Sequence, residues 1–165
     1  MVKAKPVELY SIDAESAVLG GLIIDNILFD EIADVITPND FYLHAHQVIF
    51  KGIYVLLSNG KPVDILILDQ YFTEQSILEQ LGGFAYIAEL VQITPTTANF
   101  KAYVDIVILY SKQRKLLKLG QHIISETQAT KSAEKLDELF EDVEKQFTDL
   151  TLSQQTEGVV DLNGT

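Results

Sequence analysis

The residues best suited to chemistry lie close together in one short stretch, from Asp40 to His46. Asp40, His44 and His46 carry the carboxylate and imidazole groups that bind transition metals in proteins. The two histidines are two positions apart, however, and that spacing does not place both rings on one helical face. A small metallohydrolase built on these residues is therefore one hypothesis. Histidines at the surface or at the start of a helix are the simpler interpretation.

Other catalytic patterns do not occur in the 165 residues. Gly60-Lys61 lacks the upstream glycine of a P-loop and runs directly into Pro62. The absence of cysteine excludes disulfides, thiolate metal sites and cysteine nucleophiles, and it suits a cytoplasmic protein. His122 stands alone in its helical pattern, which favours a packed or solvated side chain. We predict no catalytic, cofactor-binding or metal-binding residues in this chain.

The charge balance indicates which partners the chain suits. Twelve basic and 24 acidic residues give a formal net charge of -12, which repels a phosphate backbone at long range. One group of cations could touch DNA or pair with the acidic last helix, and pairing is the simpler interpretation: Lys112, Arg114, Lys115 and Lys118. We expect weak or absent DNA contact and protein partners. No apolar run is long enough to cross a membrane.

Apolar periodicity and strong breaks predict short helices throughout residues 1–98. Ser11 and Asp64 are placed to cap two of them, and Asn26 to cap a helix that continues to Ile36. The apolar run after Asp64 could also form a strand, but its capping residue favours a helix. The pair Gly20-Gly21 within a helical pattern predicts close approach by another element.

The stretch from Leu81 to Val107 separates two kinds of pattern. A glycine pair and then Thr94-Pro95 bracket a short helix, and from Asn99 the apolar pattern continues to about Thr127. A turn at residues 130–133 leads into a last helix. We therefore predict an all-α fold with a compact globule of short helices at 1–98. A long antiparallel helical hairpin follows at 99–152, and 153–165 begin an interdomain linker.

The last helix of the hairpin has an apolar stripe on one face and acidic residues on the other. A two-helix hairpin cannot bury such a stripe on its own, and an exposed apolar band is typical of an association surface. We predict that the interface residues lie on the hairpin: Leu116, Leu119, Ile123, Leu136, Leu139, Phe140, Val143 and Phe147.

Four stretches of the chain resemble the N-terminal domain of the DnaB family of bacterial replicative DNA helicases. They keep the order and spacing of that family: SIDAESAVLGGLIIDN (11–26), DFYLHAHQVIF (40–50), GKPVDILIL (60–68) and GGFAYIAELVQITPTTANFKAYVDIV (82–107). The hairpin from Lys112 to Leu152 is less similar in sequence but agrees in layout. The resemblance covers most of the first 110 residues.

The resemblance implies a scaffold and interaction domain. In this family neighbouring hairpins pair, and six such domains form a collar, commonly a trimer of dimers, where DnaG-type primase docks. Helicase loaders contact the helicase in some systems. ATP and Mg²⁺ are then expected only in a C-terminal motor domain, which has no counterpart in these residues. The alternative is a stand-alone helical adaptor that binds or inhibits a helicase or primase.

Overall fold

The computed structural model describes the backbone of residues 7–162 and the side chains of residues 7–152. Every regular element within residues 7–162 is helical, which confirms the predicted all-α class. The chain divides into two compact units, Met1–Ser111 and Lys112–Thr165. The first unit is called the globule below, and the second is called the hairpin unit.

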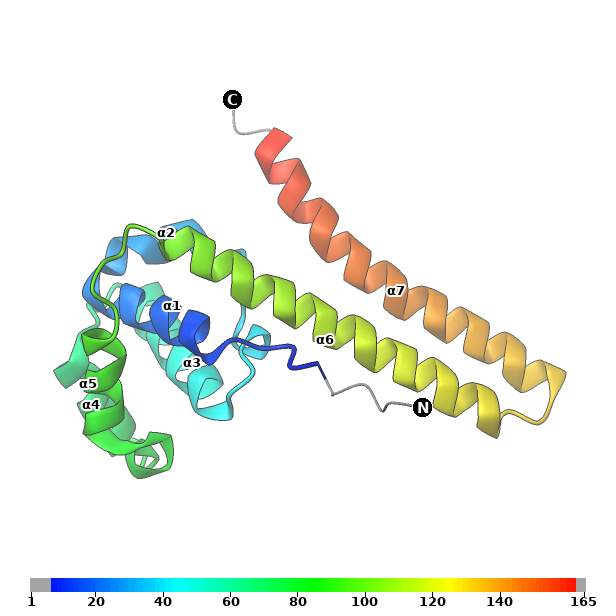
Figure 1. Ribbon diagram of the computed structural model, residues 1–165, viewed down its shortest axis with the longest axis horizontal. Helices are drawn as coiled ribbons and strands as arrows, with labels where there is room; N and C mark the ends of the chain where they lie inside the picture. The colour runs from blue at the N-terminus through cyan, green and yellow to red at the C-terminus, as the bar shows by residue number, and fades with distance from the viewer. Residues whose placement is uncertain (1–6, 163–165) are drawn as a thin grey trace. The chain divides into compact units, whose positions relative to one another are not determined.

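The globule contains the short helices (Figure 1). Its α-helices are α1 (Ile12–Ile24), α2 (Phe29–Ile32), α3 (His44–Ser58), α4 (Ile65–Glu74) and α5 (Gly83–Gln92), followed by the first part of α6 (Phe100–Ala129). Three 3₁₀ turns connect them: η1 (Asn26–Leu28), η2 (Pro38–Asp40) and η3 (Leu78–Leu81). Helix α1 packs against α3 and α5, and α4 packs against α3 and α5.

Helix α1 shows why the glycine pair lies inside a helix. Ser11 caps it by accepting a hydrogen bond from the Ala14 amide, at 3.1 Å. A Cβ atom on Gly20 would lie 2.3 Å from the backbone oxygen of Leu90 in α5. Only a residue without a side chain allows this approach, so the predicted close packing at the glycine pair is confirmed.

Helix α4 is a helix and not a strand, as its cap predicts. The Asp64 carboxylate accepts from the Ile67 amide at 2.8 Å, which satisfies one of the free donors of the first turn. Leu68 and Phe72 lie one turn apart and are both buried, whereas Leu66 is exposed. The apolar run of α4 therefore covers both a buried face and an exposed face of the helix.

The predicted second helix, Asn26 to Ile36, is wrong in its cap and its length. The structure has a 3₁₀ turn and then the single α-helical turn α2. Asn26 does not cap this segment, because its side-chain amide donates to the Val63 carbonyl and accepts from the Val63 amide, each at 3.0 Å. Asp25 is the cap instead, accepting from the Ile27 amide at 3.2 Å.

The core of the globule lies between α1, α3, α4 and α5. Its largest fully buried apolar side chains are Phe41, Phe50, Phe72, Leu19, Leu22, Ile36, Ile49, Ile53, Leu68, Ile87 and Leu90. Helix α6 adds Phe100, Val104 and Val107 to the same cluster. Burial of this many apolar side chains is the dominant favourable term in the folding of a domain of this size.

Because the first turns of α6 contribute to the core, the division between the two units falls inside this helix and not at its start. The predicted boundary at 98/99 lies one residue before the start of α6 at Phe100, whereas the division by contacts lies inside that helix, at Ser111/Lys112. Periodicity shows where a helix begins and does not show with which neighbours each of its turns packs.

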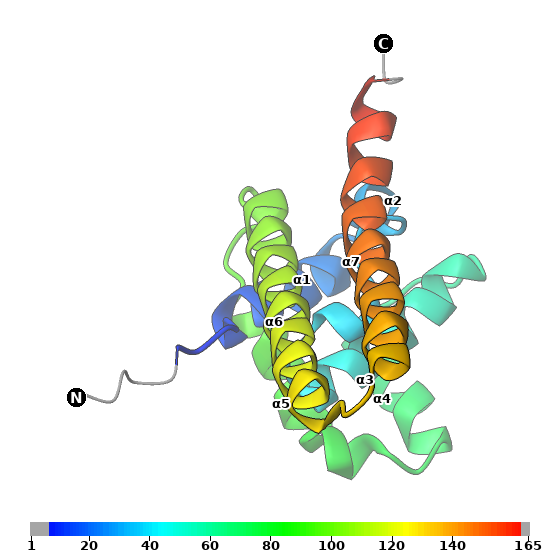
Figure 2. The same cartoon turned by 90° about the vertical axis from the view of Figure 1, so that its right-hand side faces the viewer.

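The hairpin unit consists of residues 112–129 of α6 and of α7 (Ala133–Leu162), which run antiparallel (Figures 1 and 2). Ser132 caps α7 by accepting from the Lys135 amide at 3.2 Å. The predicted helix end near Leu152 is too early, because α7 continues for ten further residues. Residues 153–162 contain no proline and one glycine, so nothing in their backbone chemistry stops a helix. The last part of the predicted linker, residues 163–165, lies outside the described residues.

Candidate interaction surfaces

The hairpin unit exposes much of its apolar surface. Among the eight predicted interface residues, five have exposed side chains: Leu116 (56%), Ile123 (36%), Leu136 (38%), Phe140 (66%) and Phe147 (52%). Leu139 and Val143 are half-buried, and Leu119 is 6% exposed. Leu119 is therefore covered within the chain, and it is the member of the predicted set with the least surface to offer a partner.

The predicted set misses exposed leucine and isoleucine side chains on α6. Leu117 is 51% exposed and Ile124 is 62% exposed, next to the predicted Leu116 and Ile123. The pairs 116–117 and 123–124 are seven residues apart, which returns each pair to the same side of the helix. That repeat is visible in the sequence, so the apolar surface is wider than one stripe. The exposed row, as used below, consists of Leu116, Leu117, Ile123, Ile124, Leu136, Phe140 and Phe147.

A polar contact joins the two helices of the hairpin unit. Nε2 of His122 lies 2.9 Å from Oδ2 of Asp142, and both side chains are partly exposed. The same carboxylate oxygen accepts from the Gln146 amide at 2.9 Å. The hydrogen bond with His122, followed by that with Gln146, lowers the pKa of Asp142 below its ordinary value. His122 is therefore neither buried nor alone, because it pairs with α7.

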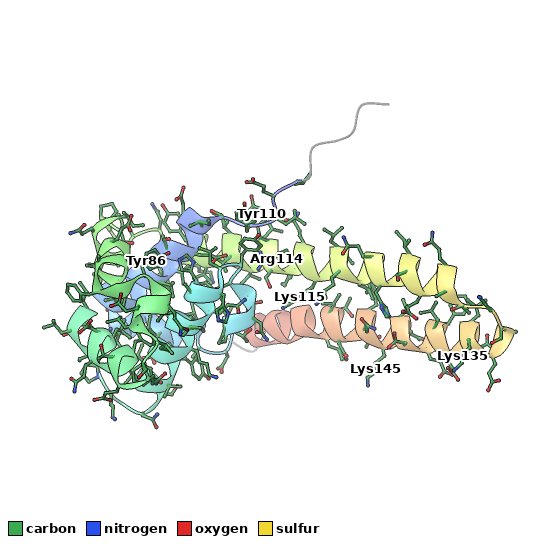
Figure 3. All side chains as sticks on the ribbon, turned by 90° about the horizontal axis from the view of Figure 1, so that it is seen from below. Tyr86, Tyr110, Arg114, Lys115, Lys135 and Lys145 are labelled. Atoms are coloured by element: carbon green, nitrogen blue, oxygen red, sulfur yellow. The ribbon has the colours of Figure 1, made fainter. Side chains whose placement is uncertain are left out.

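The basic group of the hairpin is divided between exposed and half-buried positions. Arg114 and Lys115 extend from α6, and Lys135 and Lys145 from α7 (Figure 3). Lys112 and Arg114 are half-buried, whereas Lys115 and Lys118 are exposed. Lys112, Arg114 and Lys115 each have an interaction partner. Pairing of this group with the acidic last helix stays a prediction.

The metal-site hypothesis fails on the placement of its three residues. His44 lies at the first position of α3 and is not buried, whereas His46 is fully buried and Asp40 is 7% exposed. Asp40 and His46 belong to two different hydrogen-bond networks. Within residues 7–152, no three acidic or histidine side chains converge as a metal site requires. Both histidines lie in the first turn of α3, as the simpler interpretation allows, but His46 is a core residue and not a surface one.

His46 belongs to a buried polar network that ties three helices together. Its Nδ1 lies 2.8 Å from Oε1 of Glu15 in α1, and its Nε2 contacts the hydroxyl of Tyr86 in α5. Because an ionised carboxylate only accepts hydrogen bonds, Nδ1 is the donor to Glu15. Nε2 then accepts a hydrogen bond from the Tyr86 hydroxyl. The network Glu15–His46–Tyr86 thus joins α1, α3 and α5.

Glu15 has a second task in the same network. Its Oε2 accepts from the Tyr42 amide at 2.7 Å, and its Oε1 accepts from the Leu43 amide at 3.4 Å. The carboxylate therefore satisfies backbone donors in the turn before α3. Burial, together with the negative charges of Glu89 and Glu15, raises the pKa of Tyr86, while a hydrogen bond with Ser16 acts in the opposite direction. No pattern in the sequence marks these contacts, because the partners are 27 to 40 positions apart.

The globule also has a shallow apolar pocket of about 290 Å³. It is lined by Ile23, Ile24, Asp64, Ile65, Leu66 and Val91. Leu66 is 70% exposed, and Ile24 is 47% exposed. Such a site can accept an apolar side chain, but it brings together no groups that could do catalysis. Within residues 7–162, no helix combines the length and the apolar content that crossing a membrane requires.

Comparisons with known proteins agree with this architecture. A family model described as the DnaB-like helicase N-terminal domain matches residues 7–108. The replicative DNA helicase DnaB of Pasteurella multocida is 37% identical over 151 residues, in a match that covers 88% of this chain and 32% of that relative. The chain therefore spans about a third of the length of this curated relative.

Two solved structures show the same fold. The crystal structure of the N-terminal domain of DnaB helicase from Mycobacterium tuberculosis matches with a TM-score of 0.79 at 26% identity, covering 87% of this chain and 99% of that one. A structure of a DnaB-like replicative helicase and its interactions with primase matches with a TM-score of 0.69 at 28% identity. That match covers 90% of this chain and 34% of the helicase chain. On the all-α globule, the long hairpin and these matches, the chain belongs to the family of DnaB-like helicase N-terminal domains.

Proposed function

We propose that this chain is a scaffold and interaction domain of a bacterial replicative DNA helicase. It associates with copies of itself through the hairpin and offers a docking site for a DnaG-type primase during DNA replication in the cytoplasm. The single observation that supports this most strongly is the exposed row of the hairpin unit, on a chain of this family. Seven leucine, isoleucine and phenylalanine side chains stay in water unless a partner covers them.

The exposed row favours a partner of like architecture. Helices associate by placing apolar side chains of one between those of the other, and residues repeating every seven positions keep that contact along the helix. Both helices of the hairpin unit carry such residues, so two hairpins can pair side by side. A dimer of this kind, extended to a trimer of dimers or a hexameric collar, is the assembly we propose.

Primase docking rests on the comparison and on the chemistry of the surface. One of the two matched structures is that of a DnaB-like helicase and its interactions with primase. The net charge of -12 suits a protein partner with a basic face better than it suits DNA. Contact with DNA is accordingly weak or absent in this domain. A helicase loader is a further candidate partner.

Catalysis belongs elsewhere in this proposal. The polar networks of the globule, Glu15–His46–Tyr86 and Asp40–Ser111, satisfy structural hydrogen bonds in its interior. A motor domain outside these residues would bind ATP and Mg²⁺ and unwind DNA. The present domain would hold copies of that motor together and recruit the primase.

The test is sedimentation velocity of the chain alone and mixed with the DnaG-type primase of its source organism. We expect a self-associated species for the chain alone and a faster co-sedimenting complex in the mixture. The variant Phe140→Asp should lose the first species because it places a charge in the exposed row. A chain that stays strictly monomeric and does not bind primase would contradict the proposal. Binding to an intact helicase without self-association would favour the stand-alone adaptor instead.

A further inference from the structure

Helix α6 is attached to the globule by a regular series of buried side chains. Phe100, Val104 and Val107 are 2–3% exposed and face the core at successive turns of the helix. The next position on this face is Ser111, four residues after Val107, and its side chain is 1% exposed. The apolar series that attaches α6 to the globule thus ends at Val107, and the last buried position of the series is polar.

The Ser111 side chain donates a hydrogen bond to Asp40, whose carboxylate is oriented by other bonds. Its hydroxyl donates to Oδ1 of Asp40 at 2.6 Å. The other oxygen of Asp40 accepts from the Thr37 amide at 2.7 Å and from the Thr37 hydroxyl at 3.1 Å. The bond from the Thr37 amide is one half of the capping box of η2, and the two bonds together fix the orientation of the carboxylate. Asp40 is therefore aimed at α6 by its own turn.

The position of this bond along the chain is informative. Ser111 is the last residue of the globule, and Lys112 is the first of the hairpin unit. Within the final turn, Leu109 is 55% exposed and Tyr110 is half-buried, so neither is a strong anchor. Ile108 is partly buried against the core. Ser111 is therefore the most deeply buried side chain of this turn.

We propose that the Asp40–Ser111 hydrogen bond is a latch that sets the point along α6 at which the packing of the globule ends. When it is closed, the turn from Ile108 to Ser111 is fixed to the globule. When it opens, that turn is released while Phe100, Val104 and Val107 stay buried. A hydrogen bond suits this role because it weakens steeply with small changes of distance and angle, whereas apolar contact is non-directional.

The segment that carries the acceptor is connected to two further parts of the globule. Two residues after Asp40, the amide of Tyr42 donates to Glu15 of α1. The Tyr42 ring stacks on that of Tyr10, with ring centres 4.0 Å apart and planes 4° from parallel. A partner that displaces Tyr10 or shifts Tyr42 therefore acts on a segment two residues from the latch.

The test measures distances inside the globule by pulsed electron paramagnetic resonance. The chain has no cysteine, so two introduced cysteines carry the only spin labels. One pair, Lys51→Cys with Leu109→Cys, joins exposed positions on α3 and on the latched turn. A second pair, Lys51→Cys with Lys101→Cys, joins α3 to the part of α6 that stays docked. Each pair is measured with and without Ser111→Ala.

We expect Ser111→Ala to broaden the distance distribution of the Lys51–Leu109 pair at least twofold and to leave the Lys51–Lys101 pair unchanged. Thr37→Val, which removes one contact to Asp40 without altering α6, should broaden the first pair by a smaller factor. The matched control is Ser125→Ala, the same change at an exposed position of the same helix, and it should alter neither pair. An unchanged Lys51–Leu109 distribution in Ser111→Ala would overturn the latch. Equal broadening of both pairs would also overturn it, because the whole globule would then have loosened.

Discussion

Most phenylalanine side chains of the globule are buried, with Phe84 the exception at 45% exposed, whereas both phenylalanines of the hairpin unit are exposed. In the globule Phe41, Phe50 and Phe72 are at most 1% exposed and pack against one another or against tyrosine. In the hairpin unit Phe140 is 66% exposed and Phe147 is 52% exposed. The globule has thus already buried these large apolar groups within one chain. The hairpin unit keeps comparable groups on its surface, where another molecule can cover them.

Acid–histidine pairs show the same difference. The side chains of Glu15 and His46 in the globule are 2% and 0% exposed, and those of Asp142 and His122 in the hairpin unit are 49% and 36% exposed. A buried pair loses its water and depends on its partner, whereas an exposed pair exchanges partner for water at little cost. We infer that the globule supplies most of the stability of the fold and that the hairpin unit supplies surface for assembly.

The largest expected effect comes from the buried pair. Glu15→Ala removes the acceptor of His46 and of two backbone amides, and we expect it to lower the free energy of unfolding by roughly 3–5 kcal/mol. The matched control is Glu138→Ala in the hairpin unit, where an exposed carboxylate pairs with Lys135 at 3.3 Å. That change should cost less than about 1 kcal/mol. Urea denaturation followed by circular dichroism measures both, and equal losses would erase the contrast between the units.

A second comparison places one methyl group in each unit. Gly20→Ala puts a Cβ 2.3 Å from the Leu90 oxygen and 2.2 Å from the Thr94 hydroxyl, so α1 and α5 must separate. We expect a loss of about 3 kcal/mol. Gly120→Ala meets no atom within 4 Å and should stabilise α6 by roughly 1 kcal/mol through helix propensity. Thermal unfolding of the two variants should therefore move in opposite directions; a shift in the same direction would contradict the packing described for α1.

The third prediction concerns association and not folding. Phe147→Asp should weaken self-association at least tenfold, because burying one aromatic ring contributes roughly 1.5–3 kcal/mol. Helicity and the free energy of unfolding of the monomer should stay within about 0.5 kcal/mol of the parent. Thr148→Asp adds the same charge at the next exposed position of α7 and should leave association nearly unchanged. Sedimentation equilibrium gives the constants. Equal weakening by both variants would point to charge alone and not to the exposed row.

The smallest effect is expected at the exposed pair. The hydrogen bond with His122 lowers the pKa of Asp142 below its ordinary value of 3.8. The ionised carboxylate therefore stabilises the folded state at pH values above 3.8. This contribution is lost as the pH falls from 3.8 through the lower folded pKa. His122→Ala should raise the pKa of Asp142 toward 3.8, as measured by a carboxyl ¹³C titration. Gln146→Ala, which removes the second-largest cause, should raise it less. An unchanged pKa in His122→Ala would mean that the two helices are not joined at this point.

Local features of the fold could be predicted from the sequence. Ser11 and Asp64 cap helices because short polar side chains before an apolar pattern satisfy the first free amides. Gly20 was expected to allow a close approach, and Leu90 makes it. The all-α class and the long hairpin followed from periodicity and from two breaks. These features depend on neighbours within a few positions along the chain, which a sequence pattern shows. The exception is the identity of Leu90 as the close neighbour of Gly20, which only the structure gives.

The features that could not be predicted depend on distant partners. The place of His46 near a helix start was expected, but its burial was not, since Glu15 and Tyr86, 31 and 40 positions away, allow it. Leu119 was expected to face a partner, but its side chain is already buried within the chain. Periodicity identifies an apolar face and does not show what covers it. The unit boundary at Ser111 coincides with one hydrogen bond across 71 positions.

The end of α7 was placed too early for a different reason. The change to polar residues after Leu152 predicts a stop, but the helix continues to Leu162. Glutamine and glutamate lose little side-chain freedom in a helix and propagate it readily. Loss of the apolar stripe therefore marks the end of a packed face and not the end of the helix.

If the proposed function is correct, the hairpin unit covers its exposed row by self-association. Light scattering after size exclusion, over a wide range of concentrations of the unmodified chain, measures this without any label or partner. We expect a mass that rises with concentration from monomer to dimer or hexamer, and a fall back toward monomer in Phe147→Asp at the same concentrations. A strictly monomeric mass at every concentration would contradict the proposal, because the exposed row would then remain in water without a partner.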